Sequence, residues 1–211
     1  MLKKVALFGF ALMMPLWLQA AEKFEAGKHY VELDTPVRTA DVNKVEVVEM
    51  FGYPCPHCNS FEPSLEVWEK KAADDVDFKR VPVVFGRSWE PMARAYYTSE
   101  LLKTLDKTHK ATFDAVHIDK RRFRNKDDLA EFYGELGVDS KKFNKYFNSF
   151  AVESKLKQGD SKVRGYGVEG VPTMVVNGKY RVTGHMAGGQ AKMLEVVNFL
   201  IEKERQEMAQ Q

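Results

Sequence analysis

The sequence has few cysteines, no excess of charge of either sign and, beyond residue 20, no long hydrophobic run. Its 211 residues include 32 Lys and Arg against 30 Asp and Glu, a formal net charge of +2. This balance gives no reason to propose a nucleic-acid partner. After residue 20 no stretch of roughly 18 apolar residues occurs, so a soluble mature protein is expected. The content of 44% hydrophobic and 29% charged residues excludes disorder and a collagen-like architecture.

Residues 1–20 have the pattern of an export signal. Two lysines form a short positive start, and residues 5–18 form an uncharged run that is shorter than the ~20 residues a spanning helix needs. Cleavage by a signal peptidase is expected after Ala20 or Ala21, although a second small residue is missing from its usual place. An uncleaved membrane anchor is the alternative. A cleaved signal places the mature protein in an oxidising compartment, where a cysteine pair can form a disulfide.

Strand patterns lie at both ends of the remaining chain, and helical patterns lie between them. The β-branched and apolar segment Val45–Phe51 is typical of a strand buried on both faces. A helix is predicted over residues 56–73 and a second strand over residues 78–85, which Pro82 places at a sheet edge or bulge. This order is a βαβ unit with a right-handed crossover. A short edge strand is expected over residues 29–33.

The middle of the chain, residues 89–164, has helical spacing throughout. Three apolar stripes predict the core of a helical subdomain, and Asn125 is the expected N-cap of one helix. The stripes comprise Ala93, Tyr97, Leu101 and Leu105; Leu129, Phe132, Tyr133 and Leu136; and Phe143, Tyr146, Phe147 and Phe150. Strand character returns at Thr173–Val176 and residues 179–183, and the Asn-Gly between them predicts a tight hairpin. A last helix is expected over residues 190–205.

The two cysteines, Cys55 and Cys58, lie together in the tetrapeptide Cys-Pro-His-Cys. At the start of a helix this spacing brings two sulfurs within reach of a disulfide. Such a small ring closes almost no loop, which argues against a purely structural crosslink. A closed zinc site needs four ligands, and the sequence has no second cysteine pair or closely spaced histidine pair, so no metal is predicted. The pair therefore favours thiol–disulfide exchange.

The local sequence also predicts the direction of this exchange. Pro56 suits the first helical position, which puts Cys55 at the N-cap, beside free amide groups and the positive end of the helix dipole. His57 adds a donor or a positive charge near the same sulfur. Because a stabilised thiolate favours the reduced protein, the disulfide is readily passed on, and we expect an enzyme that donates disulfides.

Three segments together resemble the DsbA family of periplasmic thiol:disulfide oxidases: residues 47–58, 170–173 and 177–180. The resemblance covers essentially the whole mature chain. It implies an α/β protein with the thioredoxin fold, a central mixed β-sheet flanked by helices, carrying an inserted α-helical subdomain. The expected boundaries are residues 21–88 and 165–211 for the two parts of the thioredoxin domain and residues 89–164 for the insertion.

The resemblance also implies a role for each residue of the site. Cys55 would be the exposed nucleophile that forms a mixed disulfide, and Cys58 the buried partner that resolves it. Pro56 and His57 would set the redox potential. Val171 and Pro172 match the family's cis-proline loop, which packs beside the disulfide and pairs with the substrate backbone.

Glu49 matches the family's buried acid beneath the active site, which would accept the proton that the buried cysteine loses. A solvated position near the end of its strand is the alternative. The lysine that accompanies this acid in some relatives has no obvious counterpart, and only Arg87 lies near the expected place.

The expected function is that of a monomeric periplasmic oxidase that donates the Cys55–Cys58 disulfide to newly exported, unfolded proteins and so promotes their folding. It would need no cofactor besides this disulfide, and the resemblance implies recharging by a quinone-linked membrane partner of the DsbB type. A disulfide isomerase or reductase on the same fold is one alternative, although too few residues precede the first core strand for the dimerisation domain of periplasmic isomerases. A periplasmic peptide-binding or metal-holding protein without turnover is another.

Overall fold

The structure is a computed structural model that describes residues 23–210. The expected export signal, residues 1–20, lies outside the described residues. Within residues 23–210 no helix has both the length and the apolar composition that crossing a bilayer requires.

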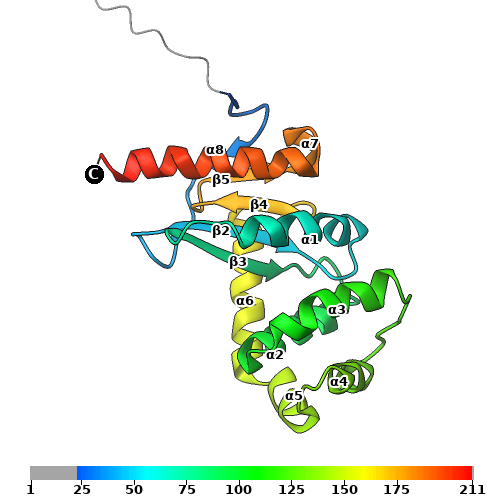
Figure 1. Ribbon diagram of the computed structural model, residues 1–211. Helices are drawn as coiled ribbons and strands as arrows, with labels where there is room; N and C mark the ends of the chain where they lie inside the picture. Colours follow the sequence, from blue (N-terminus) through cyan, green and yellow to red (C-terminus); the bar gives the residue numbers. More distant parts are fainter. Residues whose placement is uncertain (1–22, 211) are drawn as a thin grey trace, which may run out of the picture.

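A mixed sheet forms the centre of the described chain, with its strands in the order β1-β5-β4-β2-β3 (Figure 1). β2 and β3 pair in parallel, and the other neighbouring strands pair antiparallel. Every residue of β2 is buried, as predicted for a strand covered on both faces, and β3 lies at an edge, as Pro82 predicted. The strands are β1 (Val31–Glu32), β2 (Val45–Phe51), β3 (Val76–Pro82), β4 (Thr173–Val176) and β5 (Tyr180–Thr183).

The helices fall into two groups. One group flanks the sheet, and the other comprises the helices inserted between β3 and β4, which gather beyond the β3 edge while α6 runs back to the sheet (Figure 1). The flanking helices are α1 (Pro56–Glu69), α7 (Gly184–Ala187) and α8 (Gln190–Met208). The inserted helices are α2 (Glu90–Leu102), α3 (Leu105–His117), α4 (Lys126–Glu135), α5 (Ser140–Phe147) and α6 (Phe150–Gly165). The thioredoxin fold with inserted helices is therefore confirmed.

The alternation of side chains along β2 divides the interior between the two faces of the sheet. Val45 and Val47 pack with α1 and α8, whereas Val48 and Met50 pack with residues at the end of α6. The same alternation directs Glu49 towards α1. At the end of β2, Phe51 packs in a third cluster, which joins aromatic side chains of α2 and α3 to both cysteines. The inserted helices thus complete the packing around the cysteine pair.

Several predicted boundaries need correction. α8 continues to Met208 instead of residue 205, and β1 spans only Val31–Glu32 of the predicted residues 29–33. α1 ends at Glu69 instead of residue 73, and β3 spans Val76–Pro82 instead of residues 78–85. The cause is the parallel register, in which Val45 pairs with Val76. Because β3 begins at Val76, α1 must end several residues before the predicted residue 73 for the chain to reach the start of the strand.

The third aromatic stripe also needs correction, because Phe150 is 87% exposed. The stripe assumed one continuous helix, but α5 ends at Phe147 and Ser149 caps α6 by accepting a hydrogen bond from the backbone of Val152. Phe150 therefore begins a new helix with a different phase. The predicted cap at Asn125 is confirmed, since its side chain accepts from two backbone amides of α4.

The hairpin between β4 and β5 turns at Asn177 and Gly178, as predicted, with positive φ angles of 49° and 63°. Glycine is required at the second position for a further reason. A Cβ atom on Gly178 would lie 1.9 Å from the carbonyl oxygen of Val37.

We expect Gly178→Ala to lower the free energy of unfolding by about 3 kcal/mol, since the backbone strain and the collision add. Gly137→Ala is the matched control: Gly137 also has a positive φ, of 80°, but a Cβ there would meet nothing within 4 Å. It should lose only about 1 kcal/mol. Urea unfolding of the oxidised protein measures both losses, and equal losses would contradict the role of Val37.

Candidate active site

The site forms where β2 ends and α1 begins. Cys55 is the N-cap of α1, with extended backbone, and Pro56 is the first helical residue, both as predicted. The backbone N–H of Cys58 donates a hydrogen bond to Cys55 Sγ at 3.4 Å. The sulfur therefore occupies the place of a capping oxygen, at a helix end whose amide groups have no partner within the helix.

Both cysteines are free thiols in this structure. Cys58 is fully buried, as expected, but Cys55 is only 7% exposed, so its expected exposure needs correction. The cis-proline loop covers it, and Cys55 Sγ donates to the carbonyl oxygen of Val171 at 3.3 Å. Pro56 and His57 are exposed on the first turn of α1.

Hydrogen bonding separates the pKa values of the two thiols. The side chain of Cys58 makes the largest contribution to lowering the pKa of Cys55 to about 6, and the backbone amides of Cys58 and His57 act in the same direction, against burial. Burial, together with the hydrogen bond to Cys55, raises the pKa of Cys58. Near neutral pH the pair thus has one sulfur that exists largely as thiolate and one that stays protonated.

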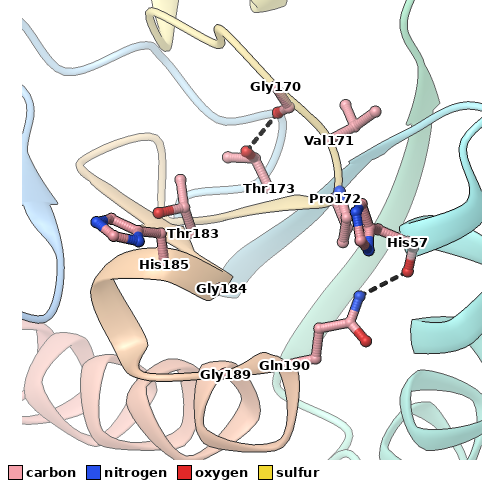
Figure 2. A pocket seen from close by; sticks show the side chains of 10 residues that line it. All are labelled: His57, Gly170, Val171, Pro172, Thr173, Thr183, Gly184, His185, Gly189 and Gln190. Carbon is pink, nitrogen blue, oxygen red and sulfur yellow. Dashed lines mark hydrogen bonds between the residues drawn. The ribbon is translucent and has the colours of Figure 1, made fainter.

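The peptide bond between Val171 and Pro172 is cis, as the resemblance implied. Thr173 follows at the start of β4, and its hydroxyl donates to the carbonyl oxygen of Gly170 at 2.7 Å, which closes the turn before the strand. Figure 2 shows this loop on the side of the site that carries His57, and Pro172 and His57 line the same groove.

A groove with a volume of about 410 Å³ opens between this loop and α1 (Figure 2). One wall carries His57, and the opposite wall comes from the segment around α7. At the base, Gln190 Nε2 donates to the carbonyl oxygen of His57 at 2.6 Å. The lining residues are His57, Gly170–Thr173, Thr183–His185, Gly189 and Gln190.

Glu49 is fully buried on the side of β2 that faces α1, so the solvated alternative is wrong. Burial raises the pKa of its carboxyl group well above the ordinary value, and the charge of Glu62 adds to this effect while Arg80 opposes it. The carboxyl group of Glu49 therefore keeps its proton at pH values where an exposed glutamate is ionised.

Arg80 is the basic partner that the sequence analysis missed. Its Nε lies 3.3 Å from Glu49 Oε2, while its other nitrogens lie 2.9 Å from Glu62 Oε1 and 2.8 Å from Glu69 Oε2. Arg87, the residue that seemed nearest in sequence, is exposed. The parallel pairing of β2 and β3 places Arg80 directly opposite Glu49, and this register is the signal that the sequence did not reveal.

A histidine of the inserted helices extends this buried cluster. His109 Nε2 on α3 lies 3.3 Å from Glu62 Oε1, and His109 Nδ1 shares a hydrogen bond with the hydroxyl of Tyr53 at 2.9 Å. Burial alone would raise the pKa of Glu62, but His109 and Arg80 outweigh it and lower the pKa. The cluster thus pairs a protonated acid, Glu49, with an ionised one. In the sequence His109 had no neighbour that marked it as part of the site.

We expect Glu49→Gln to stabilise the oxidised protein increasingly as the pH rises above about 4.5. The raised pKa of Glu49 means that its contribution to stability is complete below the unfolded value of 4.5 and declines as the pH rises towards the folded value. A neutral glutamine avoids that decline. Denaturant unfolding between pH 4 and 9 measures the difference, and Glu131→Gln on the exposed side of α4 is the control. Parallel profiles for wild type and Glu49→Gln would contradict the raised pKa.

The fold and the site together define a class: thioredoxin-fold proteins with a cysteine pair at a helix N-terminus and a cis-proline loop beside it. A model of the DSBA-like thioredoxin domain family matches residues 75–196. The chain is 44% identical over 187 residues to the thiol:disulfide interchange protein DsbA of Pseudomonas syringae pv. tomato, covering 89% of this chain and 87% of that protein.

The DsbA of Pseudomonas aeruginosa is 40% identical over 205 residues, which cover 97% of this chain and 94% of that protein. Its crystal structure superimposes with a TM-score of 0.86 at 40% identity, covering 90% of this chain and 99% of that chain. The chain therefore belongs to the DSBA-like thioredoxin domain family. It is a thiol:disulfide oxidoreductase that acts in disulfide bond formation.

Proposed function

We propose that the protein oxidises newly exported, unfolded proteins in the periplasm by donating the Cys55–Cys58 disulfide. The observation that carries this proposal is the position of Cys55 Sγ at the N-cap of α1, where the Cys58 amide donates to it. A sulfur held in this way is a stable thiolate and a good leaving group. The reduced enzyme is thereby favoured, and the disulfide is passed to the substrate.

The reaction proceeds in two exchanges. A substrate thiolate attacks Cys55 Sγ, so that a mixed disulfide forms and the bond to Cys58 breaks. Cys58 leaves as a thiolate and takes a proton, for which Glu49 is the buried donor beneath it. A second substrate thiolate then attacks the substrate sulfur, and Cys55 leaves as a thiolate. The substrate has lost two electrons and the enzyme has gained them.

During recharging the steps reverse, and Glu49 accepts the proton as Cys58 attacks the mixed disulfide with the oxidant. A quinone-linked membrane protein of the DsbB type is the proposed oxidant, and no cofactor besides the disulfide is proposed. Pro56 and His57 tune the potential through the first turn of α1. Val171 and Pro172 present backbone to an extended substrate peptide beside the groove.

The proposed location follows from the first residues of the chain. We propose that residues 1–20 direct export and are then removed, which leaves a monomeric enzyme in the periplasm. The pairing of one low and one raised thiol pKa suits this oxidising compartment, because the disulfide is the reactive state that must be maintained there.

We expect the reduced protein to be more stable than the oxidised protein at pH 8.5. The folded pKa of Cys55, about 6, lies below the free-thiol value of ~8.5, so the thiolate contributes fully above that value and its contribution is lost as the pH falls through 6. Urea unfolding of both redox forms at pH 8.5 and pH 5 measures the difference. A more stable oxidised form at pH 8.5 would favour the reductase alternative.

The two cysteines should also differ in alkylation. In Cys58→Ser the serine hydroxyl still donates to Cys55, so iodoacetamide should label Cys55 rapidly at pH 7. In Cys55→Ser the remaining Cys58 is buried, and its raised pKa should leave it unlabelled. Mass spectrometry follows both reactions, and Cys55→Ser should also lose all oxidase activity while keeping its circular dichroism spectrum. Comparable labelling rates, or retained activity, would overturn the roles assigned here.

A further inference from the structure

The peptide unit that joins His57 to Cys58 is hydrogen-bonded at both of its ends. Its N–H, which belongs to Cys58, donates to Cys55 Sγ at 3.4 Å. Its carbonyl oxygen, which belongs to His57, accepts from Gln190 Nε2 at 2.6 Å and from Ser60 Oγ at 3.0 Å. Figure 2 shows the Gln190 side chain reaching from the start of α8 to this carbonyl group. One peptide unit therefore connects the reactive sulfur to the side chain of Gln190, which lies 133 positions from His57 in the sequence.

The orientation of the Gln190 amide follows from its neighbours. With the opposite orientation, two oxygen atoms would face each other at the 2.6 Å contact with His57. The observed orientation also places Gln190 Oε1 3.2 Å from Ser60 Oγ, whose one proton is shared between this oxygen and the His57 carbonyl oxygen. Gly188 and Gly189, with φ angles of 83° and 124°, turn the chain just before α8 and bring Gln190 into this position.

We propose that Gln190 is a positioning residue for Cys55, acting through the His57–Cys58 peptide unit to stabilise the thiolate. A hydrogen bond accepted by a peptide carbonyl polarises the unit and strengthens the donor at its other end. The same contact fixes the first turn of α1, so that the Cys58 N–H stays aimed at the sulfur. This inference rests on the proposed role of Cys55 as the reactive thiolate.

The proposal places part of the redox tuning outside the Cys-Pro-His-Cys segment. Pro56 and His57 act from within that segment, whereas Gln190 acts from another helix and touches neither sulfur. A mere tether between α1 and α8 would stabilise both redox forms equally, because both contain the same helices. A role in positioning is specific to the reduced form, since only that form carries the thiolate.

The test is the substitution Gln190→Met, which removes the donor and keeps the length of the side chain. We expect the pKa of Cys55 to rise, with about threefold less thiolate at pH 5, because cooperative polarisation changes a charge-assisted hydrogen bond by roughly a tenth to a third of its strength. The equilibrium constant with glutathione should shift about threefold towards the disulfide form. Ultraviolet absorbance of the thiolate and equilibration in glutathione buffers measure the two quantities.

Gln158→Met is the matched control, since Gln158 lies on the exposed side of α6 and also makes one hydrogen bond, to Ser154. It should change neither quantity. Ser60→Ala, which removes the second donor to the His57 carbonyl, should shift the pKa in the same direction as Gln190→Met and provides a second variant if the first folds poorly. Unfolding of the oxidised forms measures any general loss of stability.

The outcomes separate this proposal from the function on which it rests. If wild-type Cys55 titrates like a free cysteine, the assignment of the oxidase function fails. If wild-type Cys55 has a low pKa but Gln190→Met and Ser60→Ala change neither the pKa nor the glutathione equilibrium, Gln190 is only a tether and the proposal is overturned. A rise in the pKa for both variants, with Gln158→Met unchanged, supports it.

Discussion

The hydrogen bond from the Cys58 amide to Cys55 Sγ is the interaction on which the rest of the site depends. It exists because a short turn leads from the end of β2 at Phe51 to Cys55, and Pro56 starts the helix in the position where a missing N–H costs nothing. An amide that would otherwise need water is satisfied by sulfur, and the sulfur gains a partner that favours its charged form. In the proposed mechanism, the surrounding residues either hold this geometry or supply and accept the proton of the second cysteine.

The buried acid cluster shows how the inserted helices contribute to a site that lies on the thioredoxin sheet. Glu49 and Arg80 face each other across two parallel strands, and Glu62 extends the cluster along α1. His109 then reaches it from α3, in the insertion. Since uncompensated charge is very costly in a protein interior, the two acids and the arginine constrain one another. The insertion is therefore part of the electrostatic environment beneath Cys58 as well as a cover for the pair.

Much of the fold could be predicted because its signals are local. The strand Val45–Phe51, the Asn-Gly hairpin and the caps at Cys55 and Asn125 each depend on residues within a few positions of one another. The features that escaped prediction depend on contacts between distant segments. The partner of Glu49 follows from the register of β3, and the low exposure of Cys55 follows from how closely Val171 of the predicted cis-proline loop contacts it.

The contact from Gln190 means that the Cys-Pro-His-Cys tetrapeptide is not a self-contained module. The His57 carbonyl group of this segment accepts a hydrogen bond from Gln190, which follows the inserted helices and strands β4 and β5 in the sequence. If the four residues were grafted into another thioredoxin scaffold, they would lack the hydrogen bond that Gln190 donates to the His57 carbonyl oxygen.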